Sequence, residues 1–120
     1  MALSTTPIIA CEEHEHHSSA ELRARVLDPL ASQRAADIFR ALGDASRLRL
    51  LALMLHGEMC VSEIAAALRA NLPAISQRLK LLKSERIVAS RRAGKHVYYK
   101  LADQHIADLI SNALAHAAEV

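Results

Sequence analysis

The sequence predicts a mainly α-helical chain with one small β-hairpin, and three observations lead to this prediction. Apolar residues make up 52% of the 120 positions, yet the chain has one Phe, two Tyr and no Trp, so its core must be aliphatic, as in packed helices. Apolar positions recur three and four residues apart over most of the chain, which is the helical period. Two β-rich runs flank a glycine-containing turn near residue 94.

The chain divides into an N-terminal tail and a folded domain. Residues 1–18 are polar, acidic and rich in histidine, and they are predicted to form a flexible tail that carries metal ligands. Residues 19–120 are long enough for one compact domain. The N-terminus lacks the basic and apolar regions of a secretory signal, and no apolar run approaches the roughly 18 residues of a membrane span. A cytoplasmic protein without a membrane partner is therefore expected.

Two helices are predicted to follow the tail. Ser18 or Ser19 can cap the first, and Pro29 should end or bend it. Ser32 can cap the second, whose apolar residues are spaced three and four apart up to a stop at Gly43.

The middle of the chain predicts a helix-turn-helix. Asp44 can cap a helix that Gly57 ends, and a short helix then opens at Cys60. After a tight turn, Asn71 can cap a further helix over residues 71–84, with a proline in its first turn, where proline is tolerated. Two helices joined in this way are typical of a DNA-binding motif whose second helix enters the major groove.

A β-hairpin and a last helix complete the prediction. The hairpin should turn at residues 92–95, and the final helix should begin near Asp103. A helix-turn-helix followed by such a hairpin predicts a winged helix-turn-helix, in which the hairpin, or wing, lies near the phosphates of DNA.

Positive charge is concentrated in this motif. The net charge of the chain is +2, but residues 69–100 hold nine Lys or Arg against one acidic residue, Glu85, which is typical of a DNA-binding surface. Ser76, Gln77 and Arg78 are the predicted base readers, because glutamine pairs with adenine and arginine with guanine. The other predicted DNA contacts are Lys80, Lys83, Arg91, Arg92 and Lys95.

Four residues near the C-terminus are good metal ligands: Asp103, His105, His116 and Glu119. The two histidines lie roughly 16 Å apart along a helix, too far for one ion, but close to three full turns apart and so on one face. The pattern predicts a homodimer in which an antiparallel second copy completes each site, with Asp103 and His105 from one chain and His116 and Glu119 from the other. Such a set suits Zn²⁺ best, with Co²⁺ or Ni²⁺ also possible.

This site places a condition on Asp103. Residues two apart on a regular helix point to different faces, so Asp103 and His105 converge only if Asp103 sits at the helix cap. The alternative makes Asp103 only an N-cap and the other three ligands a solvated edge of the helix.

A second candidate metal site comprises Cys11, His14, His16, His17, Cys60 and Glu63. The helix dipole would favour the Cys60 thiolate at a helix start, and Glu63 lies three residues on, facing the same way. Cys11 and one tail histidine could complete a thiolate-rich site that also accepts Cd²⁺ or Pb²⁺. The alternative is a buried Cys60, a Glu63 that serves as a cap partner, and an unstructured tail.

From about residue 34 onward, the chain resembles the ArsR/SmtB family of metal-responsive bacterial transcriptional repressors, in its zinc-sensing branch. The resemblance is carried by residues 41–51, 60–65, 75–83 and 94–99 and by the ligand pairs Asp103 with His105 and His116 with Glu119. The chain differs at the centre of the recognition helix, where Ser76-Gln77-Arg78 replaces the common Ser-His-Gln, and at its opening, Asn71-Leu72-Pro73.

The resemblance implies a homodimeric repressor, not an enzyme, that binds a palindromic operator when apo and dissociates on metal binding, so that metal efflux or sequestration genes are expressed. A second hypothesis keeps the repressor but makes Cys11 and Cys60 the sensor of Cd²⁺, Pb²⁺ or a thiol oxidant. A third, from another class, is a zinc-storage protein or hydrolase; four protein ligands argue against hydrolysis, because a catalytic zinc keeps an open position.

Overall fold

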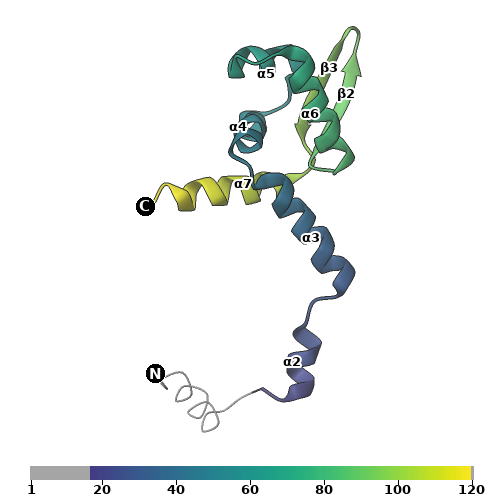
Figure 1. Ribbon diagram of the computed structural model, residues 1–120, viewed down its shortest axis with the longest axis vertical. Helices are drawn as coiled ribbons and strands as arrows, with labels where there is room; N and C mark the ends of the chain where they lie inside the picture. The colour runs from purple at the N-terminus through teal and green to yellow at the C-terminus, as the bar shows by residue number, and fades with distance from the viewer. Residues whose placement is uncertain (1–16, 120) are drawn as a thin grey trace. The chain divides into compact units, whose positions relative to one another are not determined.

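The computed structural model of the protein describes residues 17–119, so most of the predicted tail lies outside the described residues (Figure 1). The chain separates into two units, Met1–Ser32 and Gln33–Val120. Its helices and small antiparallel sheet confirm the predicted fold class. Among the described residues, no helix has the length and apolar character needed to cross a membrane.

The first unit contains a short helix, α2 (Ser19–Arg25), that Ser18 caps. The Ser18 hydroxyl accepts a hydrogen bond from the Glu21 N–H at 3.1 Å. The Glu21 carboxylate accepts in return from the Ser18 N–H at 2.7 Å. This reciprocal pair satisfies two backbone donors that the helix itself leaves open.

Helix α3 (Pro29–Leu42) begins at Pro29, so the prediction of a start at Ser32 is wrong. The Asp28 carboxylate accepts hydrogen bonds, both 3.1 Å long, from the two N–H groups that follow Pro29. Proline fits the first helical position because no intrahelical bond needs its missing N–H. Pro29 therefore starts this helix instead of ending the previous one, which stops at Arg25.

The second unit continues from α3 through short helices and three strands of the described chain. They are α4 (Ala45–Leu53), the 3-10 turn η3 (Met54–His56), β1 (Met59–Cys60), α5 (Val61–Leu68), α6 (Leu72–Ser84), β2 (Val88–Ala93), β3 (His96–Leu101) and α7 (Gln104–Ala117). Asp44, Asn71 and Asp103 cap α4, α6 and α7 as predicted, each accepting a hydrogen bond from a backbone N–H of the first turn.

The hairpin belongs to a three-stranded antiparallel sheet in the order β1-β3-β2. Strands β2 and β3 pair over their full lengths, so the turn is Gly94 and Lys95 and not the four residues 92–95. Gly94 has φ +62°, which glycine adopts without steric cost. The sequence does not predict β1, whose two residues, Met59 and Cys60, pair with β3.

The core of the second unit is aliphatic, as the composition predicts. Its most deeply buried large side chains are Leu50, Leu51, Ile64, Ile75, Leu79, Leu82, Ile87 and Ile110. They come from α4, α5, α6, the segment before β2 and α7, so burying them holds these elements together. On α6, the helical spacing of Ile75, Leu79 and Leu82 predicts the buried face correctly.

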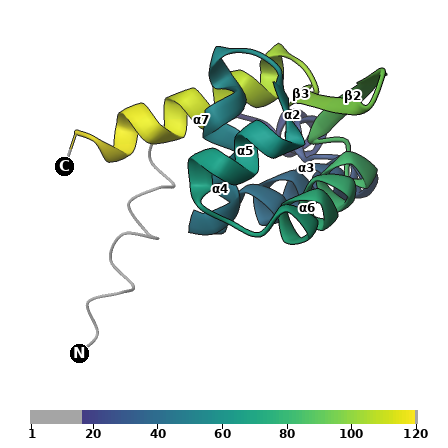
Figure 2. The same cartoon turned by 90° about the horizontal axis from the view of Figure 1, so that it is seen from above.

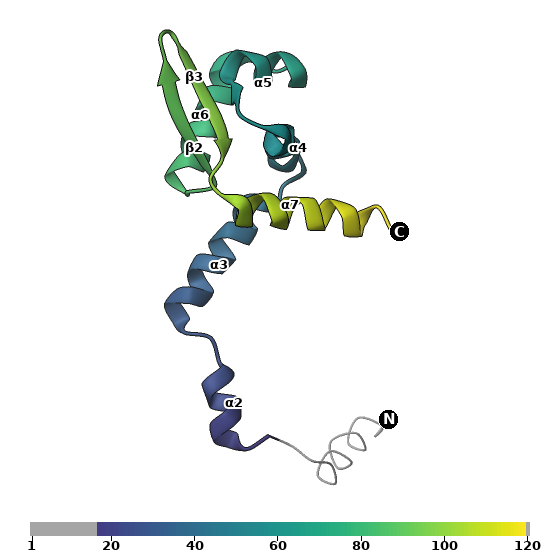
Figure 3. The ribbon, with the colours of Figure 1, turned by 180° about the vertical axis from the view of Figure 1, so that it is seen from behind.

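The second unit separates the surface formed by α5, α6 and the wing from the exposed C-terminal half of α7. Helix α5, the start of α6 and the tip of the β2–β3 hairpin lie at one end, at the top of Figures 1 and 3. Helix α4 lies between α5 and α7 in both views. Seen from above, the C-terminal half of α7 projects beyond the other helices (Figure 2), and residues 111–119 are all exposed.

Candidate DNA-binding surface and metal half-sites

Helix α6 separates its apolar and polar residues cleanly. Ile75, Leu79 and Leu82 face the core, while the predicted DNA contacts on this helix stay open to solvent. Gln77, Arg78, Lys80 and Lys83 are exposed, and Ser76 is half-buried. The geometry leaves this face free for the major groove, and contact with particular bases stays a prediction.

Two grooves join α6 to the wing, the β2–β3 hairpin. One lies beside the starts of α5 and α6 and is lined by Cys60, Val61, Ser62, Leu72, Pro73, Ser76, Lys95, His96 and Val97. The other is lined by Lys80, Lys83, Ser84, Ser90, Arg91, Arg92, Val97 and Tyr99. Basic side chains from helix and wing therefore line the same surface, which suits a polyanion.

The three basic residues of the wing have different surroundings. Arg91 Nε donates to the two carboxylate oxygens of Glu58 at 3.1 and 3.0 Å, and its guanidinium forms a further close ion pair with Glu58. The same guanidinium lies 4.7 Å from the centroid of the Tyr98 ring. The side chains of Arg92 and Lys95 are exposed and have no hydrogen-bond or ion-pair partner among the described residues.

The Glu58–Arg91 pair ties the wing to the segment before β1. Its hydrogen bonds hold the pKa of the Glu58 carboxyl below its ordinary value and raise the pKa of Arg91. The sequence gives no signal for it, because the two residues are 33 positions apart and meet only through the sheet. Arg91, a predicted phosphate contact, is thus already neutralised within the chain.

Replacing Arg91 with Gln is expected to weaken DNA binding less than replacing Arg92 with Gln. A free arginine that neutralises one phosphate adds about 0.9 to the steepness of the fall of log K with log salt. Arg91 is already paired with Glu58, so its contribution to this slope should be smaller. Titrating both variants against one DNA duplex at several salt concentrations gives the two slopes. Equal losses of slope would mean that Arg91 leaves Glu58 when DNA binds.

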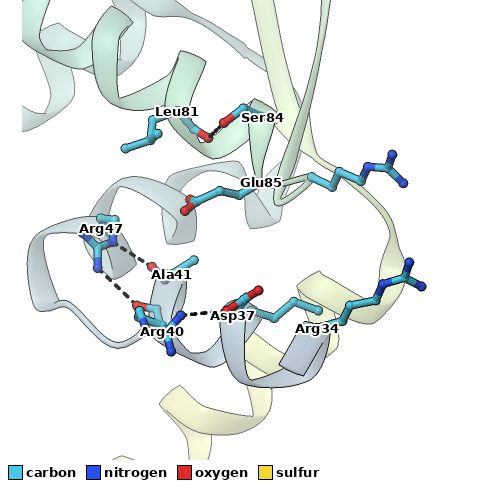
Figure 4. Close-up of a pocket in the computed structure, with 10 residues that line it drawn as sticks. Arg34, Asp37, Arg40, Ala41, Arg47, Leu81, Ser84 and Glu85 are labelled. Carbon is cyan, nitrogen blue, oxygen red and sulfur yellow. Dashed lines mark hydrogen bonds and ion pairs between the residues drawn. The ribbon is translucent and has the colours of Figure 1, made fainter. Parts of the chain in front are cut away.

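A third cleft lies at the far end of α6 (Figure 4). It is lined by residues of α3 and α4 and by Leu81, Ser84, Glu85 and Arg86. Within it, Arg40 pairs with Asp37 at 2.7 Å. Hydrogen bonds from Gln33 and Arg40 hold the pKa of the Asp37 carboxyl below its ordinary value. This cleft is away from the start of α6 and has no predicted role in DNA binding.

The C-terminal ligands form two pairs within one chain. Asp103 is the N-cap of α7, with φ −160° and ψ −180°, so it leaves helix geometry as the predicted site requires. Its Oδ1 accepts a hydrogen bond from the Ile106 N–H at 3.1 Å and lies 3.8 Å from His105 Nδ1. At the other end of α7, His116 Nδ1 lies 4.0 Å from Glu119 Oε1.

These distances suit metal coordination. Two donors on a tetrahedral Zn²⁺ lie about 3.3 Å apart, given bonds of about 2.0 Å, so small side-chain rotations bring each pair onto one ion. All four side chains are accessible, from 57% exposed for Asp103 to 94% for His105. Within residues 17–119, no three His, Cys, Asp or Glu side chains gather where they could hold a metal. Each pair offers two of the four ligands that the predicted site requires, and a shared four-coordinate site stays a prediction.

Cys60 and Glu63 have structural roles at the start of α5. Cys60 is the N-cap and is 8% exposed, and the Glu63 carboxylate accepts a hydrogen bond from its N–H at 2.9 Å. The Cys60 Sγ lies 3.1 Å from the Ser62 hydroxyl. His17 is exposed, and Cys11, His14 and His16 lie outside the described residues, so a metal site that joins them to Cys60 stays a prediction.

The sequences of known proteins identify relatives of this chain. Residues 44–90 match the family described as "Bacterial regulatory protein, arsR family". A transcriptional repressor SmtB homolog of Synechocystis is 35% identical over 119 residues, which cover 99% of this chain and 86% of that protein. A cadmium resistance transcriptional regulatory protein CadC homolog of Staphylococcus aureus is 36% identical, over 92% of this chain and 93% of that protein.

Solved structures have the same fold. The homodimeric winged helix-turn-helix DNA-binding domain of a possible ArsR-family regulator from Mycobacterium bovis superposes with a TM-score of 0.70 at 30% identity, covering 88% of this chain and 92% of that one. The solution structure of apo-NmtR gives 0.69 at 29% identity, covering 90% and 86%. These matches confirm the winged helix-turn-helix, and the chain belongs to the ArsR/SmtB family of metal-responsive bacterial transcriptional repressors.

Proposed function

We propose that this protein is a Zn²⁺-responsive repressor whose metal-free homodimer binds a palindromic operator. Zn²⁺ bound at two symmetric sites between the α7 helices releases the DNA, and genes for metal efflux or sequestration are then expressed. The observation that carries this proposal is the pair of His–carboxylate half-sites at the two ends of α7, each with donors about 4 Å apart or less.

A second chain is needed because the half-sites cannot reach each other. Eleven positions of α-helix separate His105 from His116 by roughly 16 Å, yet leave both on the same face. An antiparallel α7 of a second copy brings opposite ends together and forms two equivalent sites. Leu114, on the projecting part of α7, is 42% exposed and offers apolar surface for such a contact. The related Mycobacterium bovis domain is itself described as homodimeric.

The donor set favours zinc. Relatives are named for cadmium resistance and for antimony specificity, so membership of the family does not select the ion. Two imidazoles and two carboxylates are borderline to hard ligands, which suit Zn²⁺ in tetrahedral geometry and also accept Co²⁺ or Ni²⁺. Cd²⁺ and Pb²⁺ gain more from thiolate ligands, and this quartet has none.

DNA release requires that metal binding change the spacing of the two α6 helices in the dimer. Two α6 helices can read a palindrome only when they are spaced about one turn of DNA apart, and the wings then lie over phosphates. Fixing two α7 helices against each other at the metal sites favours one arrangement of the protomers, and release requires that this arrangement misplace the α6 helices. Coupling of about 1–3 kcal/mol is typical of such linkage and corresponds to a 5–150-fold change in affinity.

Replacing His116 with Ala is expected to abolish zinc-driven release while apo DNA affinity stays unchanged. Fluorescence anisotropy with a duplex selected from a random pool by the apo protein measures both, and zinc stoichiometry should fall from two per dimer to none at these sites. His56→Ala is the matched control, since His56 is exposed and lies outside the quartet. Zinc-driven release that survives in His116→Ala would rule out the C-terminal sites as the sensor.

A second candidate places the sensor at a site formed by Cys11 and Cys60, with Cd²⁺, Pb²⁺ or a thiol oxidant as inducer. The similarity to a cadmium resistance regulator supports it, and Cys60 lies in the groove beside the start of α6. Comparing Cys60→Ser with His105→Ala under Zn²⁺, Cd²⁺ and peroxide separates the two candidates. Loss of the response only in Cys60→Ser would favour this one.

A further inference from the structure

Two arginines occupy backbone positions that normally favour glycine. Arg69 has φ +53° and ψ +46°, and Arg86 has φ +64°; they are the non-glycine residues with positive φ among residues 17–119. Both follow a helix: Arg69 is the C-cap of α5, and Arg86 comes just after the end of α6. Glycine adopts this conformation freely, whereas a residue with a side chain is strained.

Backbone hydrogen bonds explain why residue 69 adopts a positive φ, but they do not explain why this residue is an arginine. The Arg69 N–H donates to the Ala66 carbonyl at 3.2 Å, and the Ala70 N–H donates to the Ala65 carbonyl at 2.9 Å, which closes the end of α5. Glycine at position 69 would make the same bonds without strain. The side chain at this position therefore costs stability, as it does at Arg86, so the surroundings of each arginine decide which of the two has a functional role.

The place of Arg69 suggests what its side chain does. It is exposed in the turn between α5 and α6, three positions before Leu72, which opens α6 and lines the groove with Lys95 of the wing. Among the described residues its guanidinium has no hydrogen-bond or ion-pair partner, unlike Arg40 with Asp37 and Arg91 with Glu58. It is thus an unneutralised charge beside the start of the recognition helix.

We infer that Arg69 binds a backbone phosphate beside the major groove that α6 enters. A guanidinium in this turn neutralises one phosphate and reads no base, so it strengthens binding to every DNA sequence about equally. The inference rests on the DNA-binding part of the proposed function and is independent of which metal is the inducer.

Replacing Arg69 with Gly tests this directly, because the variant relieves strain and should keep or raise the melting temperature. The expected result is a several-fold loss of affinity for the selected duplex and for unrelated DNA. The salt slope should fall by about 1.8, because the homodimer carries two copies of Arg69 and each phosphate contact contributes about 0.9. Arg86→Gly is the matched control: it removes the same charge from the same backbone conformation, but beside the cleft at the far end of α6. It should leave affinity and slope unchanged.

A charge-conserving variant completes the test. Arg69→Lys keeps the charge and the strain, so it should retain most of the affinity and the full salt slope. Wild-type affinity in Arg69→Gly, equal losses in Arg69→Gly and Arg86→Gly, or a loss in Arg69→Lys as large as in Arg69→Gly would each overturn the inference. Because every variant is compared with a wild-type protein that binds the duplex, failure of DNA binding itself would be seen first and separately.

Discussion

Mixing His105→Ala chains with His116→Ala chains is expected to restore zinc sites that neither variant has alone. If each site takes Asp103 and His105 from one chain and His116 and Glu119 from the other, either substitution destroys both sites of a homodimer. In the mixed dimer both lesions fall on the same site, and the other site is intact. Random exchange makes half of the dimers mixed, which predicts about 0.5 zinc per dimer on average in a two-fold symmetric assembly.

A second mixture provides the control. Chains with His105→Ala and chains with Asp103→Asn carry lesions in the same half-site, so every mixed dimer has one lesion in each site and no zinc should be recovered. Asparagine can still cap α7, which keeps the helix start intact. Zinc competition with a chromogenic chelator, after subunits have exchanged, measures both mixtures. Recovery in both mixtures, or in neither, would contradict the interchain arrangement.

Replacing Leu79 with Ala is expected to destabilise the protein by about 3 kcal/mol or more, whereas Leu81→Ala should cost less than about 0.5 kcal/mol. The two leucines are neighbours on α6 with opposite surroundings: Leu79 is 0% exposed in the core, and Leu81 is 59% exposed. A loss of 3 kcal/mol is a large part of the roughly 5–15 kcal/mol of a typical domain.

Urea unfolding of both variants at one fixed protein concentration measures the difference, since the stability of a dimer depends on concentration. The comparison also tests whether the exposed face of α6, which includes Leu81, stays open to solvent in solution. A large cost for Leu81→Ala would show that another chain covers this face in solution.

Local sequence signals predict most of the fold because helices and their caps are local structures. Asp44, Asn71 and Asp103 all cap the helices expected of them, and the spacing of Ile75, Leu79 and Leu82 gives the buried face of α6. The start of α3 has a local signal too: an acidic residue followed by proline, Asp28-Pro29, is a good cap and first position.

Features that depend on tertiary contact escape this reasoning. Strand β1 is two residues long and shows no alternation of its own, so its partner β3 defines it. The Glu58–Arg91 pair joins residues that only the sheet brings together. It also pairs the charge of Arg91, one of the predicted phosphate contacts, with a carboxylate of the same chain. The condition on Asp103 is different because it follows from local geometry: Asp103 and His105 converge only if Asp103 sits at the helix cap, and the structure places it there.

The position of Asp103 also bears on how the proposed metal site would act on the rest of the molecule. Only Ala102 stands between it and the end of β3, the central strand of the sheet, which is hydrogen-bonded to β1 and β2 on its two sides. Strand β1 leads directly into α5, and β2 forms the other arm of the wing. If an ion binds at the proposed site and displaces the Asp103 carboxylate, the covalent backbone and the strand pairing connect that displacement to the wing and to the helix-turn-helix without a chain of side-chain rearrangements.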